Sequence, residues 1–198
     1  MTVDVLAFSG TGRTGSLSQA LLIAATAELQ LLGATVREID LRSFNIPIYD
    51  GDQEMAQGLP RGAYELRELV KGYDTLLISS TDYNGGVVPL LKNALDWVSR
   101  PHKDEANLSA IERKTVALIS CALGMYGGSR AQNHLRQTFQ VMRCIVIPDT
   151  VCIPFADKAF DANGTLTSQV SKDMLKMAMR ELVRVSAAFA AAKSRATT

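Results

Sequence analysis

Apolar runs typical of buried strands alternate with longer segments that have the apolar spacing of amphipathic helices. The strand-like runs lie at residues 2–8, 35–40, 74–79, 114–120 and roughly 145–153. The helical patterns lie at residues 16–32, 61–72, 87–99, 128–142 and 168–192. Several strand runs are almost continuously apolar, which suits strands that helices cover on both faces. The alternation therefore predicts an α/β fold with a parallel sheet and right-handed crossovers.

A flavodoxin-like three-layer sandwich fits this strand count, with a five-stranded parallel sheet of order 2-1-3-4-5. The chain has 198 residues, of which 47% are hydrophobic, so we expect a single domain over residues 1–198. Only residues 43–60 and 154–167 resemble linkers. In this fold class, ligands bind beyond the carboxyl ends of the strands, where the strand order reverses.

The charge and composition exclude several kinds of partner. The formal net charge is +1, with acidic and basic residues spread along the chain, so we expect neither nucleic acid nor a membrane surface as partner. No apolar run approaches the roughly 18 residues of a membrane helix, and no secretory signal is recognisable, so we expect a cytoplasmic protein. The three cysteines and two histidines lack metal-ligand spacing, and no metal is expected. Small molecules are the expected ligands.

The first loop, which we define as residues 9–18 (SGTGRTGSLS), joins the first strand to the first helix. Amides at a helix N-terminus favour an anion, so this loop is typical of a phosphate site. Its glycines match G-x-G-x-x-G, and Asp40 ends the next strand, which would suit a dinucleotide-binding domain. The hydroxyl groups of Thr11, Thr14, Ser16 and Ser18 around Arg13 instead suit a terminal monophosphate, such as that of FMN. A plain turn with Ser/Thr capping is the third interpretation.

Two further loops are expected at the same sheet edge, because the carboxyl ends of parallel strands lie together. The second loop, residues 81–86 (TDYNGG), carries hydrogen-bonding groups, an aromatic ring and two glycines, as the edge of a flat ring system requires. The third loop, residues 120–129 (SCALGMYGGS), contains glycines that can turn amides toward the side of the ring where negative charge gathers on reduction. Together the three loops favour a flavin.

At this point the chain resembles the NADPH-dependent FMN reductase family, especially its small chromate and quinone reductase members. The first loop resembles the family's G-S-x-R-x-x-S phosphate motif. Residues 83–85 (YNG) and 91–97 (LKNALDW) resemble its most specific signature, and Gly124, Gly127 and Gly128 are similar to its third-loop glycines. The chain departs from the family pattern with Thr11 for serine, Ser18 for asparagine and Thr81-Asp82 for Pro-Glu.

The resemblance implies FMN as cofactor and NADPH or NADH as reductant. It implies an FMN-binding set of Thr11, Arg13, Ser16, Leu17, Ser18, Asp82, Tyr83, Asn84, Gly85, Ser120 and Gly124. No catalytic side chain is required, because the flavin itself carries the chemistry. The resemblance also implies a homodimer, or a dimer of dimers, built from the helix at residues 87–99 with the stretch at residues 46–50 reaching toward the interface.

The implied activity is an FMN-dependent NAD(P)H oxidoreductase. It would pass electrons by a ping-pong route to quinones, flavins, azo compounds or metal oxyanions. A flavodoxin-like electron carrier without nicotinamide oxidation is the alternative, although a net charge of +1 argues against the acidic surface of such carriers. Cys121 is expected to be a small apolar spacer rather than a nucleophile. Arg100 and Arg130 are candidates for the 2′-phosphate of NADPH, with solvated ion pairs as the other interpretation.

Overall fold

The parallel sheet contains the expected strands in the expected order. The structure, a computed structural model, describes residues 2–196. Its main strands are β1 (Asp4–Ser9), β2 (Thr35–Ile39), β3 (Thr75–Ser80) and β6 (Thr115–Cys121), followed by the short β7 (Ile145–Val146) and β8 (Val151–Ile153). The order is β2-β1-β3-β6-β7, with β8 also paired to β6, and every pair is parallel. This confirms the flavodoxin-like order 2-1-3-4-5.

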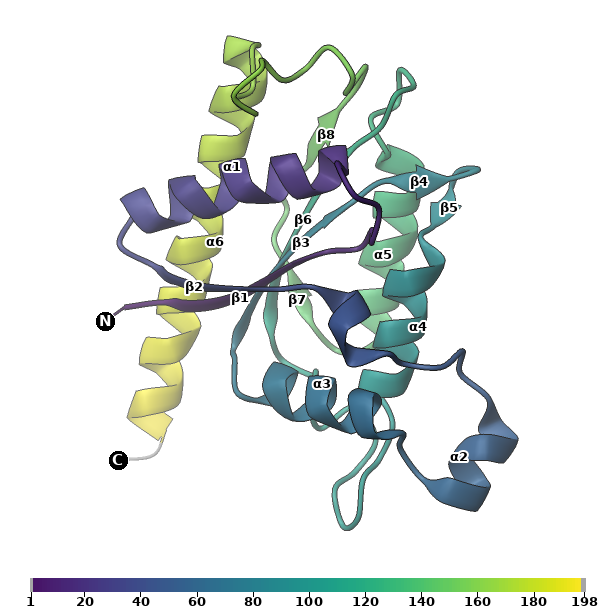
Figure 1. The fold of residues 1–198 in the computed structure, drawn as a ribbon. Coiled ribbons are helices and arrows are strands. Elements are labelled where there is room, and N and C mark those ends of the chain that lie inside the picture. Colours follow the sequence, from purple (N-terminus) through teal and green to yellow (C-terminus); the bar gives the residue numbers. More distant parts are fainter. Residues whose placement is uncertain (1, 197–198) are drawn as a thin grey trace.

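Helices cover both faces of the sheet (Figure 1). The helices α1 (Leu17–Leu31) and α6 (Gln169–Ala196) lie on one face, and α3 (Arg61–Lys71), α4 (Pro89–Val98) and α5 (Ser129–Val141) lie on the other. Side chains of a strand alternate between the faces. Val5 and Ala7 therefore join the core beneath α1 and α6, while Leu6 and Phe8 join the core beneath the other three helices. This double cover explains why the strand runs are continuously apolar.

The prediction of one continuous fifth strand at residues 145–153 was wrong. The strand is divided into β7 and β8 around Pro148, which has no N–H to donate to the ladder. The Arg136 guanidinium instead donates to the carbonyl oxygens of Ile147, Pro148 and Asp149, at 2.8, 3.3 and 3.0 Å. Both pieces still pair with β6, so the sheet order is kept.

Residues 43–60, predicted as a linker, contain regular structure. The 3-10 helix η1 (Leu41–Phe44) enters this stretch, and the helix α2 (Gly51–Gln57) lies within it. Asp40 caps η1 and Asp50 caps α2 through their carboxylates, which accept hydrogen bonds from backbone amides. The stretch is also fastened to α4, because Trp97 Nε1 donates to the Pro47 carbonyl oxygen at 2.9 Å. These aspartates were the sequence signal that the linker interpretation overlooked.

The second loop forms a small antiparallel hairpin of β4 (Asp82–Tyr83) and β5 (Gly86–Val87). Its two turn residues, Asn84 and Gly85, have φ values of 54° and 79°. Two-residue hairpin turns with positive φ at both positions favour the Asn-Gly pair. The hairpin directs Asp82 and Tyr83 toward the sheet edge and places the turn at the outer end.

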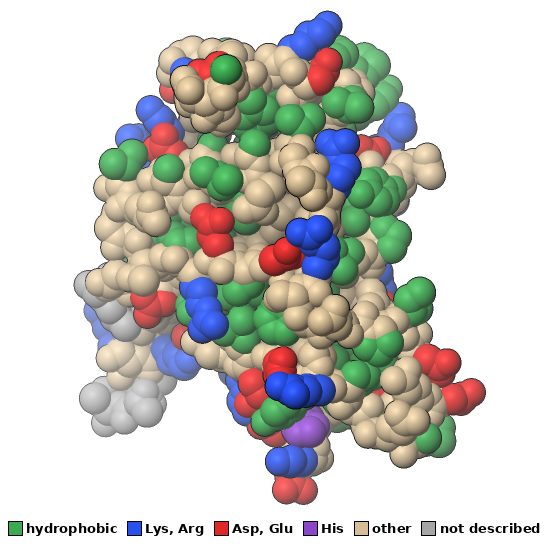
Figure 2. All heavy atoms as spheres, in the orientation of Figure 1, with side chains coloured by type: hydrophobic (Ala, Val, Ile, Leu, Met, Phe, Trp, Pro, Cys, Tyr) green, Lys and Arg blue, Asp and Glu red, His purple; other side chains and the backbone are tan. Residues whose placement is uncertain are grey.

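The surface carries charges of both signs without a single-sign patch on the face in view (Figure 2). Among the helices described, none has the length and apolar content needed to cross a membrane. Within residues 2–196, no three His, Cys, Asp or Glu side chains gather as a metal site would require.

Candidate functional site

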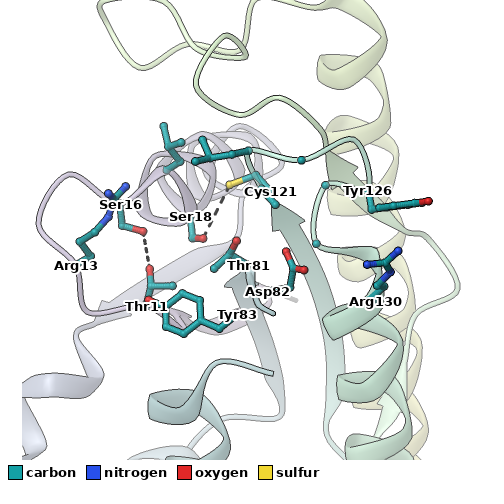
Figure 3. A pocket seen from close by; sticks show the side chains of 16 residues that line it. Thr11, Arg13, Ser16, Ser18, Thr81, Asp82, Tyr83, Cys121, Tyr126 and Arg130 are labelled. Carbon is teal, nitrogen blue, oxygen red and sulfur yellow. Dashed lines mark hydrogen bonds between the residues drawn. The ribbon is translucent and has the colours of Figure 1, made fainter. Parts of the chain in front are cut away.

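A cavity of about 490 Å³ opens between the loops that follow β1, β3 and β6 (Figure 3). It lies where the chain changes sides, because β2 lies on one side of β1 and β3 on the other. The lining residues come from the first loop and the start of α1, the second loop, and the third loop with the start of α5. They are Thr11, Arg13, Ser16, Leu17, Ser18, Thr81, Asp82, Tyr83, Cys121, Ala122, Leu123, Gly124, Tyr126, Gly127, Gly128 and Arg130.

The first loop presents hydroxyl groups at an open helix N-terminus. Ser16 occupies the N-cap of α1, but no side chain caps the helix with a hydrogen bond. The Ser16 hydroxyl instead bonds to Thr11 Oγ1 at 2.5 Å, and Thr11 Oγ1 bonds to Ser9 Oγ at 3.1 Å. Amides in the first turn of a helix have no partner within that helix. The arrangement therefore suits an anion that accepts from these amides and from the hydroxyl groups.

Arg13 adds a positive charge to this end of the cavity. Its side chain is exposed, and within residues 2–196 it takes part in none of the ion pairs. Arg130 lines the opposite side, and Asp82 is the only acidic residue among the lining residues. The balance of formal charge around the cavity is +1, from two arginines and one aspartate, which favours an anionic ligand.

The second loop contributes a ring and a carboxylate but not its turn. Tyr83 is half exposed, and its ring lies at the mouth of the cavity beside Thr11 (Figure 3). Asp82 and Thr81 also line the cavity. Asn84 and Gly85, which belong to the expected FMN-binding set, lie in the hairpin turn outside the lining. Their role in binding stays a prediction.

The third loop depends on two glycines with positive φ. A Cβ atom at Gly127 would lie 2.8 Å from the backbone of Cys152, and one at Gly128 would lie 3.0 Å from Ser120 Cβ. Ser120 is buried behind the loop, where its hydroxyl donates to the Gly127 carbonyl oxygen at 2.8 Å. It therefore positions the loop and does not line the cavity. Gly124 does line the cavity, and a Cβ atom there would meet nothing within 4 Å.

The floor of the cavity contains Ser18 and Cys121, whose Oγ and Sγ atoms lie 3.9 Å apart (Figure 3). Burial raises the pKa of the Cys121 thiol to about 11, so it stays protonated near neutral pH. This agrees with the prediction of a small apolar spacer. Ser79 Oγ donates to the Ser18 carbonyl oxygen at 2.7 Å, which fastens the start of α1 to β3. Ser18 is 2% exposed, so little of it is available to a ligand.

Several lining residues were not in the predicted FMN-binding set, although one of them, Arg130, was a candidate for the 2′-phosphate of NADPH. The guanidinium of Arg130 lies 4.2 Å from the ring centroid of Tyr126, and both residues line the cavity. The third loop as a whole was expected to face the ligand, but its glycine pattern did not indicate which of its other side chains would do so. Leu123 and Tyr126 are exposed at this edge. A leucine and a tyrosine placed between loop glycines were the signal available in the sequence.

The expectation that Arg100 lies near these loops was wrong. Helix α4 starts just after the hairpin and runs back along the sheet, so its far end carries Arg100 away from the cavity. There its Nε donates to Glu54 Oε1 at 2.9 Å, and its guanidinium lies over the Tyr49 ring. The alternative interpretation of Arg100, an ion pair, is the observed one.

Two observations count against the dinucleotide interpretation of the first loop. In the order typical of dinucleotide-binding domains the third strand lies beyond the second, whereas here β1 lies between β2 and β3. Asp40 is occupied as the cap of η1, and Arg42 Nη2 donates to its carboxylate at 2.9 Å. That hydrogen bond with Arg42 lowers the pKa of Asp40.

Comparison with known proteins agrees with this geometry. The model of the NADPH-dependent FMN reductase family matches residues 3–158. An NAD(P)H-dependent FMN reductase of Pseudomonas aeruginosa is 33% identical over 182 residues, which are 91% of this chain and 93% of that protein. An NADPH:quinone oxidoreductase of Arabidopsis thaliana is 34% identical over 185 residues, with coverage of 91% and 90%.

Solved structures share the fold. The flavoenzyme NAD(P)H:(acceptor) oxidoreductase of Paracoccus denitrificans superposes with a TM-score of 0.77 at 21% identity. The match covers 92% of this chain and 96% of that one. At 21% identity, this match shows that the two proteins share a fold and nothing further.

Proposed function

Because this chain belongs to the NADPH-dependent FMN reductase family, an oxidoreductase family, we propose that it binds FMN in the cavity between the three loops. There it would oxidise NADPH or NADH and pass the electrons to small acceptors. The observation that carries the proposal is the cavity itself. It joins an uncapped, hydroxyl-rich helix start to two glycine-containing loops at one sheet edge.

The first loop would hold the terminal phosphate. Thr11 and Ser16 share a hydrogen bond, so one of their two hydroxyl groups can donate to a phosphate oxygen while the other holds it in place. The amides of Leu17 and Ser18 lie at the start of α1. Arg13 supplies a fixed positive charge beside them. Such a group of donors suits the nearly doubly charged phosphate of FMN, since charge-assisted hydrogen bonds are stronger than neutral ones.

The second and third loops would hold the ring system. Asp82 and Tyr83 line one side and Gly124 lines the other, with Asn84, Gly85 and Ser120 supporting the loops from outside the lining. The open space at Gly124 lets a flat ring approach the backbone closely. Leu123 and Tyr126 are exposed beside the cavity and would contact a second flat molecule that stacks on the ring.

When bound, FMN supplies the chemistry that takes hydride from reduced nicotinamide and returns electrons to an acceptor. The protein needs to position the two partners in turn and to exclude side reactions. One open site for both partners implies a ping-pong course. We propose quinones, flavins, azo compounds or metal oxyanions as acceptors, with quinones favoured by the activity named for the Arabidopsis relative.

We also propose that residues 1–198 form one FMN-binding domain that assembles as a homodimer or a dimer of dimers. The two hydrophobic cores lie on opposite faces of one sheet, which supports a single domain. Ile48 and Met55 are each 85% exposed on the stretch fastened to α4, and exposed apolar side chains of this size favour a protein interface. Analytical ultracentrifugation of the wild type and of Ile48→Lys with Met55→Lys tests the assembly.

The purified protein distinguishes the candidate functions directly. We expect a yellow protein whose flavin absorbance is bleached by NADPH or NADH without oxygen and restored by a quinone. A yellow protein that neither nicotinamide bleaches would support the electron-carrier alternative instead. A protein that stays colourless after incubation with FMN would contradict the proposal as a whole. A panel of quinones, azo dyes and chromate would then rank the acceptors.

A further inference from the structure

A second cavity, of about 820 Å³, lies at the opposite edge of the sheet. It is lined by Thr75 at the start of β3, Thr115 at the start of β6 and side chains of α6. The last turns of α6 lie at the end of the molecule where β1 begins (Figure 1). A six-residue strand such as β3 spans about 20 Å at about 3.3 Å per residue. This cavity is therefore well separated from the candidate flavin site.

The cavity contains a buried lysine without an ion pair. Lys114 is 5% exposed, and its Nζ donates to the Tyr73 carbonyl oxygen. Among the described residues it forms no ion pair with a carboxylate. An ammonium group has three donors, so this single hydrogen bond leaves two of them for other partners. Buried charges in proteins are normally paired, so Lys114 is positioned to interact with an anion.

The acidic residues of the same cavity are already engaged. Lys193 Nζ lies 3.0 Å from the carboxylate of Asp74, and Arg143 Nη1 lies 3.4 Å from that of Glu112. Burial lowers the pKa of Lys114 to about 8, although the nearby negative charge of Asp74 opposes this effect. The lysine thus keeps much of its charge near neutral pH, without a carboxylate of its own.

A buried serine hydroxyl group of the same cavity lacks a hydrogen-bond partner among the described residues. Ser186, on α6, is 6% exposed, and its Oγ is a buried side-chain atom with no hydrogen-bond partner within residues 2–196. The residue lines this cavity and a smaller adjoining one of about 160 Å³. A buried hydroxyl without a partner is unfavourable, and a polar group bound next to it would satisfy its hydrogen bond.

The cavity also contains a second basic side chain and an apolar wall. Arg113 contributes an exposed guanidinium, and it also forms no ion pair within the described chain. Phe189 and Ala190 of α6 form an apolar wall. The volume is much larger than an inorganic ion requires, since one water molecule occupies about 30 Å³ in the liquid.

We propose that this cavity binds a small organic anion, with its phosphate or carboxylate group on Lys114, Arg113 and Ser186 and its apolar body against Phe189. No covalent or redox step is involved. The site is independent of the proposed flavin chemistry, and its occupant stabilises the fold by completing a buried charge pair.

The test uses FMN-saturated protein, so that the first loop is occupied, and two probes, phenyl phosphate and benzoate. Titration calorimetry measures the affinity of each, with phenol as the neutral control. The variants are Lys114→Met, Ser186→Ala and Lys158→Met. Methionine keeps an unbranched side chain but removes the charge and the donors of the buried lysine. Lys158 is an exposed lysine outside the cavity and controls for the change in net charge.

We expect at least one anionic probe to bind the wild type and phenol to bind much more weakly. Lys114→Met should lower the affinity for the probe by roughly tenfold or more, and Ser186→Ala should lower it by roughly threefold. Lys158→Met should leave the affinity unchanged. The stronger of the two probes identifies the preferred acidic group. If Lys114→Met fails to fold, Ser186→Ala decides the result.

Binding of neither probe to the wild type would overturn the proposal, as would unchanged affinity in both cavity variants. A probe that is retained in Lys114→Met and Ser186→Ala but lost in Arg13→Ala binds at the first loop. That outcome would overturn the second site, and because FMN was present at saturation it would also count against FMN as the occupant of the first loop.

Discussion

The hydroxyl oxygens of Thr11 and Ser16 lie 2.5 Å apart and hydrogen-bond to each other where the chain enters α1. The two side chains thus stabilise the loop and leave the first amides of the helix uncapped by any side chain. In each hydroxyl pair only one hydrogen lies between the oxygens, so a donor remains for a ligand. The loop is therefore held in place by its own side-chain hydrogen bonds.

This relationship predicts different effects for two substitutions at Thr11. Thr11→Val keeps the shape but removes the hydroxyl, and it should weaken FMN binding by about 0.5–1.5 kcal/mol. Thr11→Ser keeps the hydroxyl and should bind FMN as the wild type does. Quenching of FMN fluorescence measures both affinities. Equal affinity of the valine variant and the wild type would exclude Thr11 as a phosphate ligand.

Arg13→Ala should reduce the affinity for FMN by about 1.5–3 kcal/mol, because a hydrogen bond to a charged group is lost. The effect should be smaller for riboflavin, which lacks the phosphate. Arg37→Ala removes an exposed arginine from β2 and serves as the control for net charge. The same fluorescence titration applies, and a loss of equal size in the control variant would argue against a direct contact.

Alanine substitutions at two glycines of the third loop should affect different properties, FMN binding at one position and stability at the other. Gly124 has open space, so Gly124→Ala should fold normally but weaken FMN by placing a methyl group in the cavity. Gly128 has a φ of +82° and lies against Ser120, so Gly128→Ala should lower the unfolding temperature even without FMN. Thermal unfolding and FMN titration of both variants separate the two effects. A destabilised Gly124→Ala would show that the loop is more crowded than described.

Cys121 should be chemically inert near neutral pH. Its pKa of about 11 lies above the usual thiol value, so the reactive thiolate appears only as the pH approaches that value. Cys121→Ala should keep nicotinamide oxidation within a few-fold of the wild type. Alkylation by iodoacetamide, followed by mass spectrometry, should leave Cys121 unmodified at pH 7 in the folded protein. Rapid modification there, or loss of activity in the alanine variant, contradicts its role as a spacer.

Glu105 should make stability depend on acidity. Hydrogen bonds with Lys71 and with the fully buried Arg67 lower its pKa from 4.5 to about 2. A lowered pKa in the folded state stabilises the protein above pH 4.5, and this contribution is lost as the pH falls through 2. Urea unfolding at several pH values should show Glu105→Gln to be less stable than the wild type at pH 6 and nearly equal near pH 2. A constant difference across this range would rule out the titration of Glu105 as its cause.

The sheet could be predicted from the sequence because its signals are local. Val5, Leu6, Ala7 and Phe8 are all apolar since both faces of β1 are covered, and that pattern is visible without coordinates. The break at Pro148 was missed although proline has no N–H, because the surrounding run is apolar and reads as one strand. The hairpin at Asn84 and Gly85 was likewise available from its dipeptide.

The residues of the candidate site could be predicted only in part from the sequence. The glycines and hydroxyl groups of the first loop predict a phosphate site by their spacing alone. The places of Ser120 behind the third loop and of Arg130 against Tyr126 depend on how α5 packs on the sheet. Arg100 illustrates the difficulty, because it is near the second loop in sequence but lies at the other end of α4.

The sequence by itself determined the order of strands and helices, the loop that opens α1 and the family to which the chain belongs. These follow from periodicity, from glycine conformations and from short motifs, all of which act within a few residues. Only the tertiary structure decided which loop residues share the cavity, and that Lys114 and Ser186 are buried together at the opposite edge. Those placements arise from contacts between residues distant in the chain, and such contacts leave no local pattern to read.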